Sequence, residues 1–430
     1  MDFLPIKRLQ SLTLIVTALC LPLAGYAQAQ ATQPALNPQP VLEIVDGYYA
    51  AYPKTSPGKT PAEEAEIREG EYLAKAGDCI ACHSNVSGGT PAYGGGLPIA
   101  TPFGTFYSPN ISPDFETGIG WWSEADFVRA IREGHGPHGE NYFPVYPFVY
   151  FANVTPEDTH KLYVYFQHIP AVHLENRSLP FPFNLPGARF TLWGWNLLFY
   201  YPNTPFSPDP TQSATWNRGK YLVDGLGHCS MCHTPLNPLG APMSRYYLNG
   251  GFIDGYWAPN INQAGLAGIP EEEIADVFAK NRLLNDAGPV AGPMAEVNHD
   301  SLRYLTREDQ LAIAHYLKTV VSQDQYAVPP KSEGQSAYSR GKQVYNEVCS
   351  ICHQAGQMGA PEIGIAANWY QRAQQQGLQG FYRHVIKGYN SMPIKGACLT
   401  CSDEDIKAAV DYILDNSLTR AQRYNLAADQ

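Results

Sequence analysis

Three short stretches of the chain place two cysteines three positions apart, with a histidine directly after the second cysteine. They are Cys79-Ile-Ala-Cys82-His83, Cys229-Ser-Met-Cys232-His233 and Cys349-Ser-Ile-Cys352-His353. Two thiols on one helical turn can add across the two vinyl groups of a porphyrin, while the adjacent imidazole binds the iron. A structural zinc site or a redox dithiol also uses paired cysteines, but neither needs this histidine three times. The sequence therefore predicts three covalently bound haem c groups.

The three motifs lie in similar sequence surroundings. A glycine stands shortly before each motif, at Gly70, Gly219 and Gly341, within an expected helix. Downstream of each motif, a second amphipathic helix is expected to begin with a capping box. The boxes are Thr155-Pro-Glu-Asp158, Thr306-Arg-Glu-Asp309 and Ser402-Asp-Glu-Asp405. Because a glycine lets another helix cross closely, each pair of helices around a motif resembles the cytochrome c fold.

These repeats predict a mainly α fold with three tandem cytochrome c domains joined by Pro-rich linkers. The expected order is a signal peptide at 1–29, an irregular arm at 30–60, domain one at 61–180, a linker at 181–214, domain two at 215–325, a second linker at 326–334, domain three at 335–418 and a tail at 419–430. A chain of 430 residues is long enough for three domains of ordinary size.

The first 29 residues have the pattern of an export signal. Lys7 and Arg8 precede an apolar run, and small residues suited to cleavage follow at Ala27 and Ala29. We therefore expect the mature protein in the periplasm. No other apolar run approaches the roughly 20 residues that cross a bilayer, so the body should be soluble or peripheral to the inner membrane. A net charge of −11 argues against nucleic acid as a partner.

Two methionines are placed to bind haem iron on the face opposite the histidine. Met294 lies just ahead of the last helix of domain two, and Met392 lies in a Ser-Met-Pro stretch of domain three. Thioether sulfur is a common sixth ligand of haem iron and raises its potential. A methionine that fills a gap in the core is the alternative. We expect Met294 and Met392 to be the sixth ligands of the second and third haems.

Domain one differs, because no methionine occurs between His83 and Met231. A Pro-Asn-Ile stretch at 109–111 matches another at 259–261, at the same spacing from the motif histidine. This register brings the methionine position of domain two close to Tyr146 in domain one. A tyrosine there is more often a packed aromatic side chain than an iron ligand.

Two histidines could serve as the sixth ligand of haem one instead. His135 and His138 lie in the stretch Gly-His-Gly-Pro-His-Gly. We rank His138 above His135 because it lies nearer to the methionine position. Imidazole donates more strongly than thioether to ferric iron, so either histidine would lower the potential of haem one, whereas an open site would leave the iron high-spin.

The last two cysteines, Cys398 and Cys401, are followed by Ser402 and cannot form a fourth haem motif. In an oxidising compartment we expect them to form a small disulfide ring just after Met392, which braces that loop. A spare dithiol with redox chemistry is the alternative.

A run of aromatic and apolar residues at 190–199 lies between the first two domains. Such a segment is either a seal between domains or a patch for a partner or a membrane face, and we favour the seal.

The first two domains resemble the cytochrome c subunits of periplasmic, membrane-associated dehydrogenases of the alcohol and gluconate type. The resemblance extends over about 69–321 and rests on the stretches at 72–83, 103–111, 118–121, 195–199 and 216–229. Similar cytochromes also serve molybdenum hydroxylases. Domain three is instead similar to cytochrome c5, through the stretches at 385–387, 392–398 and 401–404, and this resemblance implies the disulfide and a small fold with one haem. The methionine that the dehydrogenase subunits have at haem one is missing here.

The sequence contains no dinucleotide glycine motif and no flavin fingerprint, so substrate oxidation must happen on another subunit. We expect this chain to relay electrons from a periplasmic dehydrogenase, of the PQQ, flavin or molybdenum type, to quinone, a small cytochrome or a terminal oxidase. It would then not be a catalyst by itself. The alternative is a catalytic haem protein that acts on peroxide or a sulfur compound at an unusually ligated haem one. A sensor or gas-binding module is a weaker alternative, because no signalling segment is attached.

Overall fold

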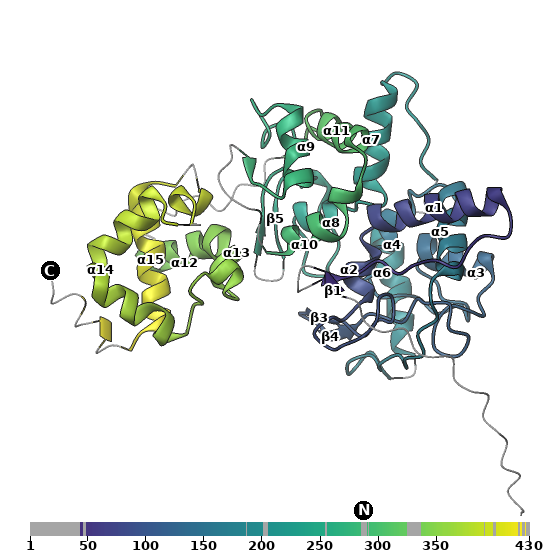
Figure 1. Cartoon of the computed structure of the whole chain (residues 1–430), viewed down its shortest axis with the longest axis horizontal. Helices are drawn as coiled ribbons and strands as arrows, with labels where there is room; N and C mark the ends of the chain where they lie inside the picture. The colour runs from purple at the N-terminus through teal and green to yellow at the C-terminus, as the bar shows by residue number, and fades with distance from the viewer. Residues whose placement is uncertain are drawn as a thin grey trace, which may run out of the picture. The chain divides into compact units, whose positions relative to one another are not determined.

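The computed structural model is mainly helical, with three short two-stranded hairpins (Figure 1). It describes residues 44–45, 49–185, 187–200, 205–253, 256–284, 290, 292–324, 337–390, 392–398, 401–419, 422–423 and 426. The expected signal peptide, most of the arm, the second linker and most of the tail lie outside the described residues. Within the described part of the chain, no helix is long and apolar enough to cross a membrane.

Domain one contains five helices and one hairpin, preceded by a short strand pair. In chain order these are β1 (Ile44–Val45), β2 (Tyr49–Ala50), α1 (Pro61–Ala76), α2 (Cys79–His83), β3 (Pro98–Thr101), β4 (Gly104–Tyr107), α3 (Glu124–Glu133), α4 (Phe148–Phe151) and α5 (Pro156–His168). The first haem motif forms all of α2. It follows Asp78, whose left-handed backbone ends the turn after α1.

Domain two repeats this order. Its elements are α7 (Ala214–Asp224), α8 (Ser230–His233), η2 (Ser244–Tyr246), β5 (Gly251–Ile253), β6 (Tyr256–Ala258), α9 (Glu271–Lys280), α10 (Pro293–Asp300), η4 (Leu302–Tyr304) and α11 (Arg307–Leu317). The second haem motif therefore occupies the same place between a first helix and a hairpin as the first motif does.

Domain three keeps the first and last helices but has no hairpin among its described residues. Its elements are α12 (Ala337–Val344), η5 (Tyr345–Cys349), α13 (Ser350–His353), η6 (Gln357–Gly359), α14 (Ala366–Lys387), η7 (Ile394–Ala397) and α15 (Asp403–Ser417). A non-helical backbone at Gly377 interrupts α14. Three repeated helical units, each around one haem motif, agree with the expected fold of three cytochrome c domains.

In every domain the first and last helices cross at the glycine before the haem motif. A Cβ atom on any of these glycines would lie 2.0 or 2.1 Å from a backbone oxygen of the last helix, closer than real Cβ atoms approach. The pairs are Gly70 with Lys161, Gly219 with Ala312 and Gly341 with Ala408. The sequence-based expectation of a close crossing is confirmed.

The expected capping boxes are only partly present. Thr155, Thr306 and Ser402 each accept a hydrogen bond from the backbone N–H three residues later. Only in α15 does the aspartate also reach back to the N-cap N–H and complete the box. In α5 and α11 the corresponding aspartates, Asp158 and Asp309, bond to tyrosine instead. The prediction of three complete boxes was therefore wrong for domains one and two.

The tyrosines that replace the box come from the neighbouring domain. Tyr72 of α1 donates its hydroxyl proton to Asp309 of α11 over 2.6 Å and accepts from the N–H of Thr306 over 3.1 Å. Tyr221 of α7 makes the reciprocal contacts with α5, at 2.6 Å to Asp158 and 3.3 Å from the N–H of Thr155. The two domains thus contact each other through equivalent residues, as in a pseudo-twofold interface.

One hydrophobic core runs through both of these domains. It combines buried side chains of domain one, such as Leu162 and Phe166, with Leu222 and Ile313 of domain two. The buried core of domain three is a separate cluster around Trp369 and Leu414. The first two domains are consequently one packing unit.

The aromatic segment between the domains forms η1 (Ala188–Phe190) and α6 (Thr191–Phe199). Leu192 is buried against Phe106 and Phe143 of domain one, and the indole N–H of Trp195 donates to the carbonyl of Leu239 in domain two over 3.0 Å. This inner side contacts both domains, as a seal between them would, and the assignment as a seal stays a prediction. The outer side is exposed to solvent, at Phe190, Trp193, Leu197 and Leu198.

Candidate haem sites

The three motif histidines share one hydrogen-bond arrangement. In each of them Nδ1 lies 2.7 or 2.8 Å from a proline carbonyl oxygen, which can only accept a hydrogen bond. The pairs are His83 with Pro109, His233 with Pro259 and His353 with Pro361. Nδ1 is therefore protonated, and the neutral ring presents the lone pair of Nε2 to a metal. Burial lowers the pKa of all three imidazoles, which favours this neutral form.

A backbone bond also holds each motif histidine. Its carbonyl accepts from the N–H of Gly95, Gly250 or Ile363, each over 2.8 Å. Each histidine is therefore bonded through both its backbone and its ring. The match between the two Pro-Asn-Ile stretches identified the proline loops of domains one and two in the sequence, although it gave no sign that the proline carbonyl orients the imidazole.

The six motif cysteines are not paired with one another. Burial is the largest cause of the raised pKa of these thiols. The pKa rises to about 12 in four of them, Cys79, Cys82, Cys229 and Cys349. Two unpaired thiols that can attach to a porphyrin, beside an oriented neutral imidazole that can bind its iron, fit a covalently bound haem. This combination is the same in all three domains.

The two candidate methionine ligands lie in ordered segments. Met294 is in the first turn of α10 and is partly buried against the common core. Met392 is held by two backbone bonds with Tyr389, of 2.9 and 3.0 Å. Both residues therefore have fixed backbones. Their assignment as sixth ligands stays a prediction.

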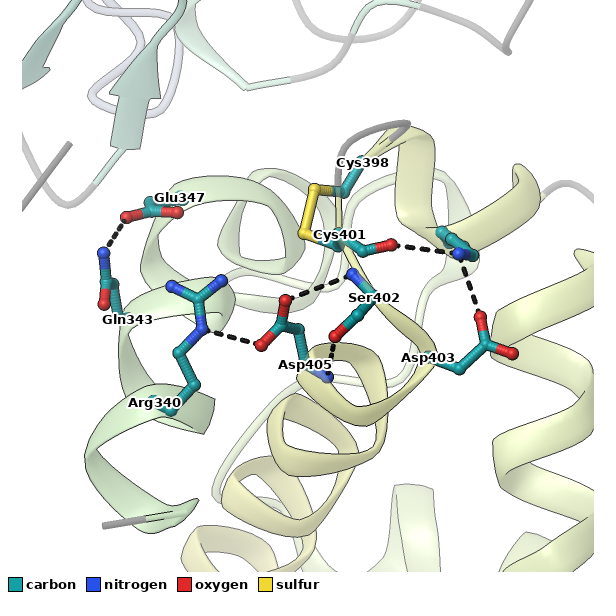
Figure 2. Close-up of a disulfide and its surroundings, with 9 residues drawn as sticks. Arg340, Gln343, Glu347, Cys398, Cys401, Ser402, Asp403 and Asp405 are labelled. Carbon is teal, nitrogen blue, oxygen red and sulfur yellow. Dashed lines mark hydrogen bonds and ion pairs between the residues drawn. A yellow bond between two sulfur atoms is a disulfide. The ribbon is translucent and has the colours of Figure 1, made fainter. Parts of the chain in front are cut away.

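A disulfide joins Cys398 and Cys401 in the loop after Met392 (Figure 2). Lys395 donates to the carbonyl oxygen of Cys401 and forms an ion pair with Asp403, each over 2.9 Å. Nearby, Arg340 of α12 bonds to Asp405 at the start of α15. The disulfide and these polar contacts tie the methionine loop to the N-terminus of the last helix.

The methionine position of domain one can be located from the backbone. Helices α3 and α9 are followed by Gly134 and Asn281, both with left-handed backbones. The carbonyl of Gly134 accepts from the N–H of Tyr142 over 2.7 Å, and that of Asn281 accepts from Val290 over 3.0 Å. The fourth residue after each donor is Tyr146 in domain one and Met294 in domain two.

The two candidate histidines of domain one have different environments. His138 is exposed, its ring stacks on Trp121 at 5.4 Å between centroids, and its backbone N–H donates to Glu140. His135 is half-buried, and among the described residues its Nδ1 is buried without a hydrogen-bond partner. Neither histidine is shown to be a ligand, and both stay predictions.

The first two haem motifs lie near each other across the domain interface. Helix α10 of domain two contacts α2 of domain one, and Glu296 and Cys232 are close enough to raise the pKa of Cys82. Reciprocally, Tyr150 of α4 lies beside Ser230 and Cys232 of domain two. Each domain thus places the helix at or beside its candidate sixth-ligand residue, Tyr146 or Met294, against the haem motif of the other.

A group of acids at this interface was missed by the sequence analysis. Burial, followed by the charge of Asp300, raises the pKa of Glu296 to about 7, and burial also raises the pKa of Asp78 and Asp300. The arm before α1 covers the group, since Tyr52 donates to the carbonyl of Asp300 and Tyr49 stacks on His299. Asp78 is far in the sequence from Glu296 and Asp300, so no spacing pattern could have indicated that the three acids meet.

Comparisons with known proteins agree with three haem domains of two kinds. Over 322 residues, or 73% of this chain, the sequence is 40% identical to one of the subunits of nicotinate dehydrogenase from Pseudomonas putida, of which the chain spans only 26%. Over 313 residues, or 68% of the chain, it is 38% identical to the gluconate 2-dehydrogenase cytochrome c subunit of Pantoea cypripedii, and this match covers 70% of that protein.

The C-terminal part has different relatives. Residues 336–413 match the family model of cytochrome c oxidase, cbb3-type, subunit III. Over 63 residues, or 14% of the chain, the sequence is 48% identical to cytochrome c5 of Ectopseudomonas mendocina, and this match covers 72% of that protein. The relatives of both kinds are c-type cytochromes or subunits that contain them. The chain carries three c-type haems and belongs to the family of electron-transferring cytochrome c subunits of dehydrogenases.

Proposed function

We propose that this chain relays electrons through three haems, from a periplasmic dehydrogenase subunit to quinone, a small cytochrome or a terminal oxidase. When bound, each haem supplies a one-electron couple. The protein holds the haems through its six motif cysteines and binds their irons through His83, His233 and His353. Met294 and Met392 are the sixth ligands of the second and third haem irons. The observation that carries the proposal is the same proline-oriented, neutral imidazole at all three motifs.

The interface between the first two domains supports a relay. Electron transfer between redox centres depends on their separation and fixed orientation, which the protein supplies. One common core and the reciprocal tyrosine bonds hold the two motifs in a defined arrangement. The residues 61–180, 215–325 and 335–418 are the proposed domain boundaries.

The partner is proposed from the relatives. Two relatives are named as subunits of nicotinate and gluconate dehydrogenases, which supports a partner subunit that oxidises the substrate and is of the PQQ, flavin or molybdenum type. We place the mature protein in the periplasm, exported through residues 1–29 and soluble or peripheral to the inner membrane. The exposed outer side of α6 is a surface that such a partner or a membrane face could cover.

Domain one motivates a second candidate function. Its sixth-ligand position holds Tyr146 instead of methionine, so haem one could act catalytically on peroxide or a sulfur compound. This candidate requires turnover by the isolated chain, whereas the relay requires a partner.

The two functions are separated by isolating the native protein together with its partners. We expect a large dehydrogenase subunit to co-purify, and its substrate to be oxidised with an artificial acceptor whether or not this chain is present. Reduction of a downstream acceptor should need the chain. Peroxide or sulfur-compound turnover by the purified chain alone, at rates comparable with those of the complex, would contradict the relay and support the catalytic alternative.

A further inference from the structure

The sixth position of haem one is defined by the fold and not only by sequence spacing. In domains one and two, the helix before this position ends in a left-handed residue whose carbonyl accepts a backbone N–H from the returning chain. Counting from that bond places Tyr146 where domain two has Met294. Both side chains are partly buried against the same core. The inference drawn from this equivalence rests on the proposed function, because it concerns one of the three haems of the relay.

The surroundings of Tyr146 show which haem motif it faces. After burial, the charge of Cys79 is the next cause of the raised pKa of Tyr146, so the phenol lies near the first haem motif. Its ring packs edge-on against Tyr142 and Phe151, each with 5.8 Å between centroids. The phenol is thus packed among aromatic rings near the first haem motif.

The chemistry of a phenol in this place differs from that of a thioether. A tyrosine binds haem iron strongly as the phenolate anion, whereas a neutral phenol is a weak ligand. The rings of Tyr142 and Phe151 form an aromatic environment around the phenol, and such an environment disfavours the phenolate anion.

We propose that Tyr146 occupies the sixth position of haem one without binding the iron, and that this haem is open to a small neutral ligand. Carbon monoxide is the probe for such a site, because it binds ferrous haem iron that lacks a strong sixth ligand. Haems two and three, with Met294 and Met392 at the corresponding positions, are closed to it. His138 plays no part, since its ring stacks on exposed Trp121.

The test is a titration of the full-length, dithionite-reduced holoprotein with carbon monoxide, followed by its absorption spectrum. The wild type should bind one carbon monoxide per chain. Tyr146→Met should bind none and gain the sulfur-to-iron band of a third methionine-ligated haem. Tyr146→Phe should still bind one, because the aromatic packing remains. The matched exchange in domain two, Met294→Tyr, should raise binding to two.

Three results would overturn the proposal. The first is a wild type that binds no carbon monoxide, and the second is a phenolate-to-iron band in its ferric spectrum that Tyr146→Phe removes. The third is binding that appears only in His135→Ala or His138→Ala, which would identify a histidine as the ligand. Each of these results leaves the relay untouched, because reduction of the haems by a dehydrogenase is measured separately.

Discussion

In domains one and two, the N-terminus of the last helix is bonded by a tyrosine of the neighbouring domain, whereas in domain three it is bonded by its own aspartate. Tyr72 and Tyr221 each stand two residues after the crossing glycine. Domain three has Gln343 there, which bonds to Glu347 of its own chain segment over 2.7 Å (Figure 2). Asp405 then completes the capping box that the other two domains leave open.

This difference shows how one fold serves either as half of a pair or as a unit complete in itself. An N-cap N–H must be satisfied, and the same group can be bonded from within the domain or across an interface. The separate cores follow the same division, with one shared by the first two domains and one confined to the third. The relatives divide in the same way, because cytochrome c5 matches the third domain alone.

The largest expected effect comes from the crossing glycines. Gly219→Ala places a Cβ atom 2.0 Å from the carbonyl oxygen of Ala312, so the helices must separate. We expect a loss of about 3 kcal/mol in the free energy of unfolding. Because the core is shared, hydrogen exchange should rise in domains one and two together. Gly341→Ala should raise it only in domain three.

A helical glycine with open space around it provides the control for these variants. No atom lies within 4 Å of the Cβ position at Gly194 in α6, so Gly194→Ala should not destabilise the protein. Increased exchange confined to domain two in Gly219→Ala would contradict the common packing of the first two domains.

The next effect should come from the disulfide of domain three. Replacing both Cys398 and Cys401 with serine removes a short covalent ring and should cost about 2 kcal/mol. Thermal unfolding followed by domain-resolved proteolysis should show the loss in domain three alone. Equal sensitivity of domains one and two would show that domain three is not a separate unit.

The reciprocal tyrosines should contribute somewhat less. Tyr221→Phe removes a hydrogen bond to the carboxylate of Asp158 and should cost about 1.5 kcal/mol. Tyr72→Phe should cost less, because Asp309 keeps two bonds from Arg218, each of 2.7 Å. Both variants should weaken domains one and two jointly in denaturant titrations.

A tyrosine bond within domain three serves as the matched control for the reciprocal pair. Tyr382→Phe removes a bond of 2.8 Å to Asp411 in the same domain. Only domain three should respond. If Tyr221→Phe destabilised domain two while leaving domain one unchanged, the reciprocal interface would not be a joint structural element.

The smallest expected effect is the pH dependence of the capping box. The hydrogen bond from Arg340, followed by those from Ser402, holds the pKa of Asp405 well below its usual value. A carboxylate with a lowered folded-state pKa contributes stability above its unfolded pKa of about 4, and this contribution is lost as the pH falls through the folded pKa. Domain three should therefore lose stability below about pH 4. Asp405→Asn should show a smaller change between pH 7 and pH 3, measured by urea unfolding.

The sequence predicted the parts of this molecule that depend on local spacing. The haem motifs, the glycine crossings and the Pro-Asn-Ile loops all follow from short patterns. The tyrosine contacts did not, because Tyr72 and Tyr221 look like ordinary aromatic residues of amphipathic helices. Their role depends on the contact between the first two domains. Through the same contact, Asp158 and Asp309 bond to these tyrosines and do not complete the capping boxes of their own helices.

The same limit applies to the group of acids between the first two haem motifs. Asp78 meets Glu296 and Asp300 of α10 only because α10 packs on α2. At the sixth position of haem one, the sequence register already pointed near Tyr146. The backbone bonds of Gly134 and Asn281 were needed to make that register specific.

The relay requires that electrons from a dehydrogenase pass into this chain. The most direct measurement is rapid mixing of the native complex with the substrate of its co-purified dehydrogenase, with haem reduction followed by absorbance. We expect the substrate to reduce all three haems in the complex, and to reduce no haem when it is mixed with the isolated chain. Substrate oxidation by the complex with all haems remaining oxidised would contradict the relay.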